Sequence, residues 1–152
     1  MQQAVPARTP AHLWIVGILS LLWSCFGCYD YLMTRMRNLD YIASSMPGVD
    51  PNAVLKWVDA MPLYAQAGWG LGVWLALAGA VLLLARSRWA VWSYGLSLLG
   101  AVLSLGYQIA LAPPLPGAPD NAMMKLMPYV IILIALALFL YARAMEKKGV
   151  LR

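Results

Sequence analysis

The chain has 152 residues, of which 62% are hydrophobic and only 11% are charged, and its formal net charge is +5. Soluble domains carry about 25% charged residues, so this composition excludes an ordinary soluble domain and favours a protein that has lipid as part of its solvent. The length suits one domain, and the basic residues stand at the ends of apolar runs, which is typical of membrane topology rather than of nucleic-acid binding.

Four apolar runs are long enough to cross a bilayer. A helix needs about 20 residues to span about 30 Å of hydrocarbon, and a chain in lipid must form helices or a closed barrel. The runs lack the alternation of barrel strands, so the sequence predicts an all-α fold, a four-helix transmembrane bundle. The spans are expected at about residues 13–33, 65–85, 89–111 and 126–145 of a single membrane domain.

The first run is predicted to be an uncleaved anchor, because it is longer than the core of a signal peptide and no small-x-small cleavage site follows it. It carries two cysteines and a carboxylate. Cys25 and Cys28 are three residues apart, so they share one side of a helix and are candidate ligands for a soft metal. The alternative is that both are small apolar residues in a packed helix.

Asp30 lies near the outer end of the first run, not at its middle, where ion-coupled carriers usually hold a carboxylate. Polar residues of other spans are expected at the same depth. The predicted polar cluster consists of Asp30, Tyr31, Thr34, Gln66, Tyr107 and Gln108. Asp30 either accepts hydrogen bonds from Gln108, a tyrosine, Arg35 or Arg37 and fixes helix register, or it lines a small ligand pocket that opens outward.

A short helix is predicted in the first outer loop, over about residues 51–60. Pro47-Gly48 is a turn signal, and Asp50 with Pro51 is typical of a helix start. Its apolar residues share one face, so it either lies on the membrane surface, with Trp57 as an anchor, or packs over the mouth of the bundle. The second outer loop is rich in proline and is expected to be irregular.

Small residues recur at the spacing that lets membrane helices approach closely. The residues expected to serve helix packing are Gly27, Gly68, Gly72, Ala76, Ser97 and Ser104. The row in the second span predicts packing against the third span, since the short turn Arg86–Arg88 makes these two spans an antiparallel hairpin. The alternative is that this row forms the seam of a homodimer.

The distribution of basic residues predicts that both termini lie in the cytoplasm. Four spans put the termini on one side, and seven of the 11 lysines and arginines fall on that side. These seven are Arg8, Arg86, Arg88, Arg143, Lys147, Lys148 and Arg152. Arg35, Arg37, Lys56 and Lys125 fall on the other side, so the positive-inside rule favours an N-in, C-in orientation.

The stretch LWIVGILSLLWSCFGCYDYLMTRMRNLDYI resembles the opening of a family of small four-span bacterial inner-membrane proteins, often labelled sugar transporters. The shared positions are Trp23, Gly27, Asp30, Tyr31, Met33, Thr34, Arg37 and Asn38. Members of that family usually have Asn in place of Ser24, and Ala or Ser in place of Cys25 and Cys28. The resemblance therefore implies a multi-pass protein of the bacterial inner (cytoplasmic) membrane in which Asp30 belongs to the common pattern and the cysteines do not.

No nucleophile–base pair, phosphate loop or metal-ligand set is recognisable in the sequence, so we expect no catalytic activity and no cofactor. The leading interpretation is an accessory subunit or binding module with an outward-facing polar cluster around Asp30. One alternative is a small-solute transporter that acts as a homodimer, and another is a soft-metal carrier that uses Cys25 and Cys28. The expected partners are the lipid bilayer and either a larger membrane complex or a second copy of the chain, without nucleic acid.

Overall fold

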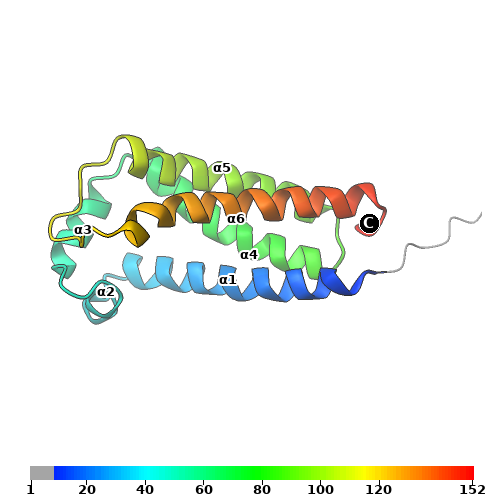
Figure 1. The fold of residues 1–152 in the computed structure, drawn as a ribbon, viewed down its shortest axis with the longest axis horizontal. Coiled ribbons are helices and arrows are strands. Elements are labelled where there is room, and N and C mark those ends of the chain that lie inside the picture. Colours follow the sequence, from blue (N-terminus) through cyan, green and yellow to red (C-terminus); the bar gives the residue numbers. More distant parts are fainter. Residues whose placement is uncertain (1–8) are drawn as a thin grey trace, which may run out of the picture.

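The computed structural model describes residues 9–152, so Arg8, which entered the orientation prediction, lies outside the described part. The described chain is all-helical. Its elements are α1 (Ala11–Arg35), α2 (Leu39–Ser45), α3 (Pro51–Asp59), α4 (Leu63–Leu84), α5 (Trp89–Ala110) and α6 (Ala122–Lys147) (Figure 1). Helices α1, α4, α5 and α6 are each long and apolar enough to cross a membrane. The predicted four-helix bundle is thereby confirmed, and the segment between α1 and α4 contains the predicted short helix, α3, and a further one, α2, that was not predicted.

The largest difference from the predicted bounds concerns the last span. Helix α6 begins at Ala122 rather than near residue 126, because the side chain of Asn121 accepts a hydrogen bond from the backbone N–H of Met124 at 2.8 Å. A capping side chain of this kind stabilises the first turn, so the helix begins directly after it. The helix therefore begins before the continuous apolar run and includes Pro128 in its second turn.

The four long helices form a bundle in which α1 and α6 pack little against each other. Helix α1 packs on α4, α4 on α5 and α5 on α6. Helices α2 and α3 lie at one end of the bundle, which we call the α3 end, and α6 finishes at the opposite end, the terminal end (Figure 1). At the terminal end a hydrogen bond between His12 of α1 and the Tyr141 hydroxyl of α6 links the two outermost helices.

Helices α4 and α5 meet through glycines. A Cβ on Gly68 would lie 2.8 Å from the carbonyl oxygen of Gly100, and one on Gly100 would lie 2.6 Å from that of Gly68. The Ser97 hydroxyl donates to the carbonyl of Gly72 at 2.6 Å. The small-residue row of the second span is thus filled by α5, as the packing prediction required, and is not free to form the seam of a homodimer.

Two residues of the predicted packing set do other things. A Cβ on Gly27 would meet only a methyl group of Val73, at an ordinary 3.7 Å, so this glycine does not mark a close approach of helices. Gly27 still faces α4, since the neighbouring Cys28 thiol donates to the Val73 carbonyl, and Gly27 also lines the cavity described below. Ala76 lines the same cavity, together with Gly68 and Gly72 of its own helix.

The terminal end of the bundle has a dense apolar core. Leu13, Leu83 and Tyr94 are almost fully buried there, and Val150 and Leu151 fold back onto them after α6. The backbone N–H of Arg152 donates to the carbonyl of Arg86 at 2.8 Å, and the N–H of Arg88 donates to the carbonyl of Arg152 at 2.9 Å. The last residues therefore close this end by pairing with the turn between α4 and α5.

The α3 end is closed by a second cluster. Val54, Leu55 and Val58 of α3 are buried against Ile42 of α2. The indole N–H of Trp57 donates to the carbonyl of Pro113, in the loop before α6, at 2.8 Å. Of the two arrangements that the sequence left open for this helix, the structure has the one packed over the bundle, and Trp57 is bonded within the protein.

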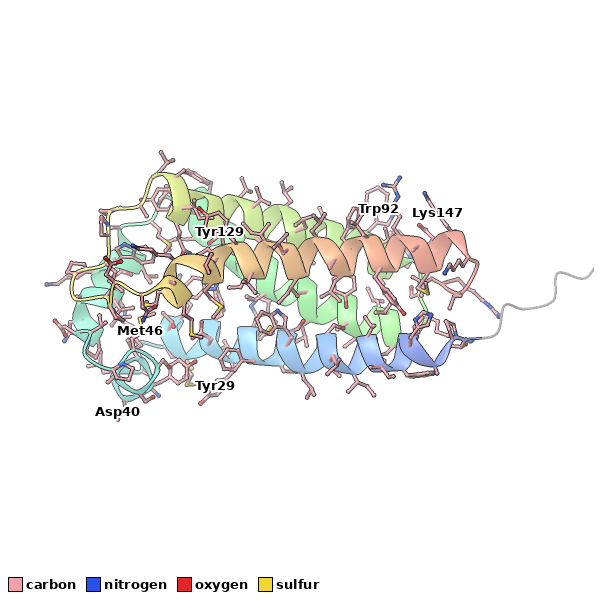
Figure 2. The ribbon with its side chains drawn as sticks, viewed as in Figure 1. Tyr29, Asp40, Met46, Trp92, Tyr129 and Lys147 are labelled. Atoms are coloured by element: carbon pink, nitrogen blue, oxygen red, sulfur yellow. The ribbon has the colours of Figure 1, made fainter. Side chains whose placement is uncertain are left out.

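The outer surface of the bundle is apolar and has aromatic residues near both ends. Trp14, Trp89 and Trp92 are exposed near the terminal end, and Tyr29, Tyr64 and Tyr129 are exposed near the α3 end. Figure 2 shows Trp92, Tyr29 and Tyr129 pointing away from the bundle. Because Trp and Tyr favour the two membrane–water interfaces, this distribution supports a bundle that spans a bilayer with its ends at opposite surfaces.

Candidate functional site

The hydrogen-bond partner of Asp30 is a tyrosine that the sequence did not single out. The Tyr41 hydroxyl donates to Oδ1 of Asp30 at 2.9 Å. Tyr41 belongs to α2, whose start is capped by the side chain of Asn38, and its ring packs edge-on against Tyr29 with 5.4 Å between the centroids. Helix α2 therefore folds back beside the outer end of α1 and brings a donor to the carboxylate.

Burial raises the pKa of the Tyr41 hydroxyl above its usual value, and the adjacent Asp30 carboxylate raises this pKa further, against a lowering by a hydrogen bond with Ser45. Both raising effects have a simple cause, since a phenolate would be poorly solvated and would repel the carboxylate. The hydroxyl consequently stays protonated and remains a donor to Asp30 at neutral pH.

The two arginines near Asp30 are engaged elsewhere. Arg35 donates to the side-chain oxygen of Gln66 at 3.1 Å, and Arg37 makes a two-bond ion pair with Asp59 of α3 at 2.8 and 3.0 Å. Together with the buried Thr34, these residues line a polar hollow of about 230 Å³ under α3. Thr34 and Gln66 thus share a site as predicted, but Asp30 is not among the residues that line it.

The remaining members of the predicted cluster lie apart from both groups. Tyr31 packs edge-on against Trp69, with 4.9 Å between the centroids, and Tyr107 packs against Tyr64 at 6.1 Å. Gln108 lines a shallow hollow beside Trp57 and the proline-rich loop. The predicted residues lie at similar depths along the bundle, but they do not come together in one site. Helices α2 and α3 occupy the space that the prediction assigned to the cluster.

A cavity of about 280 Å³ lies inside the bundle, between the α3 end and the core of the terminal end. All four long helices line it. Its walls are mostly apolar and include Trp23, Phe26, Trp69, Val73, Met127 and Ile131. Phe26 of α1 and Met127 of α6 are both well exposed. Helices α1 and α6 are neighbours that pack little against each other, and these exposed lining residues place the opening of the cavity between them.

Three polar groups in this cavity have hydrogen-bonding capacity to spare. Asp30 lines its outer part. The hydroxyls of Ser24 and Ser104 are buried, with the residues 3% and 1% exposed, and neither has a hydrogen-bond partner within residues 9–152. Buried polar groups are nearly always paired, and an unpaired one costs about 1–3 kcal/mol. Both oxygens have almost no accessible surface, so a polar group of a bound molecule would reach them only after a small shift of the neighbouring side chains.

Other hydroxyls in the cavity wall are already satisfied. The Tyr94 hydroxyl donates to Ser20 at 3.0 Å, and Ser20 donates to the carbonyl of Gly17 at 2.9 Å. Ser97 is bonded to Gly72. The contrast identifies Ser24 and Ser104 as the functional candidates that sequence reasoning missed, since a serine in an apolar span shows only that it is polar and small.

The two cysteines lie in different environments. Cys28 is buried, and its thiol donates to the carbonyl of Val73 at 3.3 Å, whereas Cys25 is exposed on the outer side of α1. No group of three or more metal-binding side chains occurs in the described part of the chain. The soft-metal hypothesis for Cys25 and Cys28 stays a prediction.

No family model, no curated protein and no solved structure matches this chain.

Proposed function

We propose that this protein is a non-catalytic binding module of the membrane that takes a largely apolar small molecule into the cavity among α1, α4, α5 and α6. The four candidate spans suggest an integral membrane protein. The observation that carries the proposal is the pair of buried, unpartnered hydroxyls of Ser24 and Ser104 in the wall of an otherwise apolar cavity.

The lining supports binding of a lipophilic molecule. Ligand sites are typically concave, mostly apolar and supplied with a few polar groups that orient the ligand, and their volumes run from about 300 to 1,000 Å³. This cavity is close to the lower limit. Its polar groups are hydroxyls and one carboxylate, without a nucleophile–base pair among the lining side chains, which favours binding over catalysis.

The route of entry follows from the helix order. The side of the cavity between α1 and α6 faces the lipid, so a molecule dissolved in the bilayer reaches the site without crossing the polar ends of the bundle. The α3 end is covered by α2, α3 and their apolar cluster. This arrangement supports lateral exchange with the membrane more than capture of a soluble ligand from the aqueous phase.

The cellular setting belongs to the same proposal. The basic residues favour cytoplasmic termini, and the resemblance of the first span favours the bacterial inner membrane. A binding module of this size fits the role of an accessory subunit that presents or senses a lipophilic molecule for a larger membrane complex. A C-terminal reporter fusion that is active only in the cytoplasm tests the orientation.

The binding proposal is tested with the neutral, lipophilic fluorophore N-phenyl-1-naphthylamine and purified protein in mild detergent. We expect saturable fluorescence enhancement above the detergent background, and its loss in Ala76→Phe, which fills the cavity. The matched control is Ala78→Phe, on the exposed side of the same helix, which should bind the probe as the wild type does. Equal binding by both variants, with melting curves that show both folded, would refute the proposal.

A further inference from the structure

We propose, as an extension that rests on the binding function above, that the ligand is a lipophilic organic cation. Its positively charged nitrogen, an amine or quaternary ammonium, lies beside Asp30. Its apolar body lies in the cavity among Trp23, Phe26 and Trp69. The inference comes from the charge that the cavity contains and from the side chains around that charge.

Asp30 lacks a cationic partner within residues 9–152. The ion pairs in this part of the chain are Arg37–Asp59 and Lys125–Asp120, and neither includes Asp30. Arg35, the next nearest candidate, is bonded to Gln66. Among residues 9–152, the carboxylate has only the Tyr41 hydroxyl as a hydrogen-bond partner, on one of its two oxygens. A charge at the edge of hydrocarbon costs free energy unless it is paired with an opposite charge. A cation bound beside Asp30 would therefore offset the free-energy cost of the unpaired carboxylate.

The aromatic walls of the cavity that Asp30 lines suit a cation as well as an apolar group. Trp23, Phe26 and Trp69 line the same cavity as Asp30, and Trp69 is held by edge-on packing against Tyr31. The face of an aromatic ring attracts an ammonium group, most strongly for Trp and where water is excluded. A carboxylate in an apolar cavity with aromatic walls therefore favours a cation over a neutral or anionic molecule.

The serines set the shape of the ligand. Ser24 precedes Asp30 by six residues on α1, which corresponds to about 9 Å along the helix axis. A molecule whose nitrogen lies beside Asp30 therefore reaches Ser24 with an atom about 9 Å away. An elongated amphiphile with a hydrogen-bonding group at that distance would satisfy a hydroxyl that the protein leaves unpaired.

The test compares two probes of equal shape and different charge. One is a phenylalkyl-trimethylammonium ion, and the other is its phenylalkyl-tert-butyl isostere, in which carbon replaces the charged nitrogen. Each displaces N-phenyl-1-naphthylamine from the wild-type protein, and the midpoints give the two affinities. We expect the cation to bind at least about tenfold more tightly than its isostere, and Asp30→Asn to remove this preference while the isostere still binds.

The matched control is Asp40→Asn, which removes a carboxylate from the exposed surface of α2 (Figure 2) and should keep the preference intact. If Asp30→Asn does not give a folded protein, Asp30→Ser makes the same comparison, with a hydroxyl left to bond with Tyr41. A wild-type protein that binds both probes equally, or an Asp30 variant that keeps the preference, overturns the inference. Neither result affects the proposed function, which fails instead if Ala76→Phe leaves fluorophore binding unchanged.

The same nitrogen chemistry occurs in free amphiphilic amines and in lipid headgroups. Repeating the titration in phosphatidylglycerol nanodiscs, with and without phosphatidylethanolamine, distinguishes the two sources. A weaker apparent affinity of the cationic probe in the presence of the ethanolamine lipid assigns the site to its headgroup. An unchanged affinity, with the preference for the cation retained, assigns the site to a free amphiphile.

Discussion

The same four long helices pack densely in one half of the bundle and leave a cavity in the other. At the terminal end, Leu13, Leu83 and Tyr94 are enclosed by side chains from several helices and by the chain after α6. In the other half, the same helices leave a cavity with two unpaired hydroxyls and a carboxylate. One half of the bundle is therefore densely packed, and the other half contains a cavity and polar groups without partners in residues 9–152. This pattern is expected of a protein whose stabilising core is separate from its candidate site.

The largest expected effect tests this contrast directly. Leu83→Ala, at a fully buried position of the terminal core, should lower the free energy of unfolding by about 2–5 kcal/mol, because the void cannot collapse. Leu105→Ala, in the wall of the existing cavity, should cost clearly less. Denaturant unfolding in detergent micelles gives both values, and equal losses would mean that the two halves are packed alike.

A smaller effect compares a satisfied with an unsatisfied hydroxyl. Ser97→Ala loses the hydrogen bond to Gly72 and should destabilise the fold by about 1 kcal/mol. Ser24→Ala removes a buried hydroxyl that has no partner in the described chain, so it should leave stability unchanged or raise it slightly. The same unfolding assay orders the two variants, and a larger loss for Ser24→Ala would show that its hydroxyl is already paired in the ligand-free protein.

The smallest effect concerns the residue that holds Asp30 at the edge of the cavity. The pKa of Tyr41 is raised in the folded protein from its ordinary value of 10.0, chiefly by burial. The stabilisation associated with its protonated form is therefore complete below about pH 10 and is lost as the pH rises through the higher folded value. Melting temperatures between pH 8 and 11 should fall less steeply in Tyr41→Phe than in the wild type.

Tyr129→Phe, which removes an exposed hydroxyl from α6, provides the reference for that measurement and should follow the wild-type curve. A Tyr41→Phe protein with the full alkaline decline would show that the decline comes from other groups, and that Tyr41 does not hold the carboxylate through its proton.

Hydropathy and local chemistry predicted the elements well and their mutual placement poorly. The four spans and the helix after Asp50 follow from length, apolar content and a capping residue, and the meeting of α4 and α5 follows from glycine spacing and a short turn. Each of these signals is local, so each can be read from one stretch of sequence.

The partner of Asp30 and the cavity depend on relations that no single stretch contains. Tyr41 reaches the carboxylate only because a seven-residue helix folds back beside α1. The opening between α1 and α6 could not be predicted, because membrane spans are apolar all round and show no face that must be covered. The contact opposite Gly27 is of the same kind, since its spacing to Asp30 does not specify that α4 places Val73 there.

The pairing of Arg152 with the hairpin turn has a practical consequence for work on this protein. Its backbone N–H and carbonyl are both engaged, with Arg86 and Arg88, and Val150 and Leu151 are held in the apolar core beside it. Any label or fusion joined after Arg152 therefore starts from a fixed point between two guanidinium-bearing residues. A folded tag joined directly here would displace Val150 and Leu151 and expose the apolar core of the four long helices, so a flexible linker of several residues is needed.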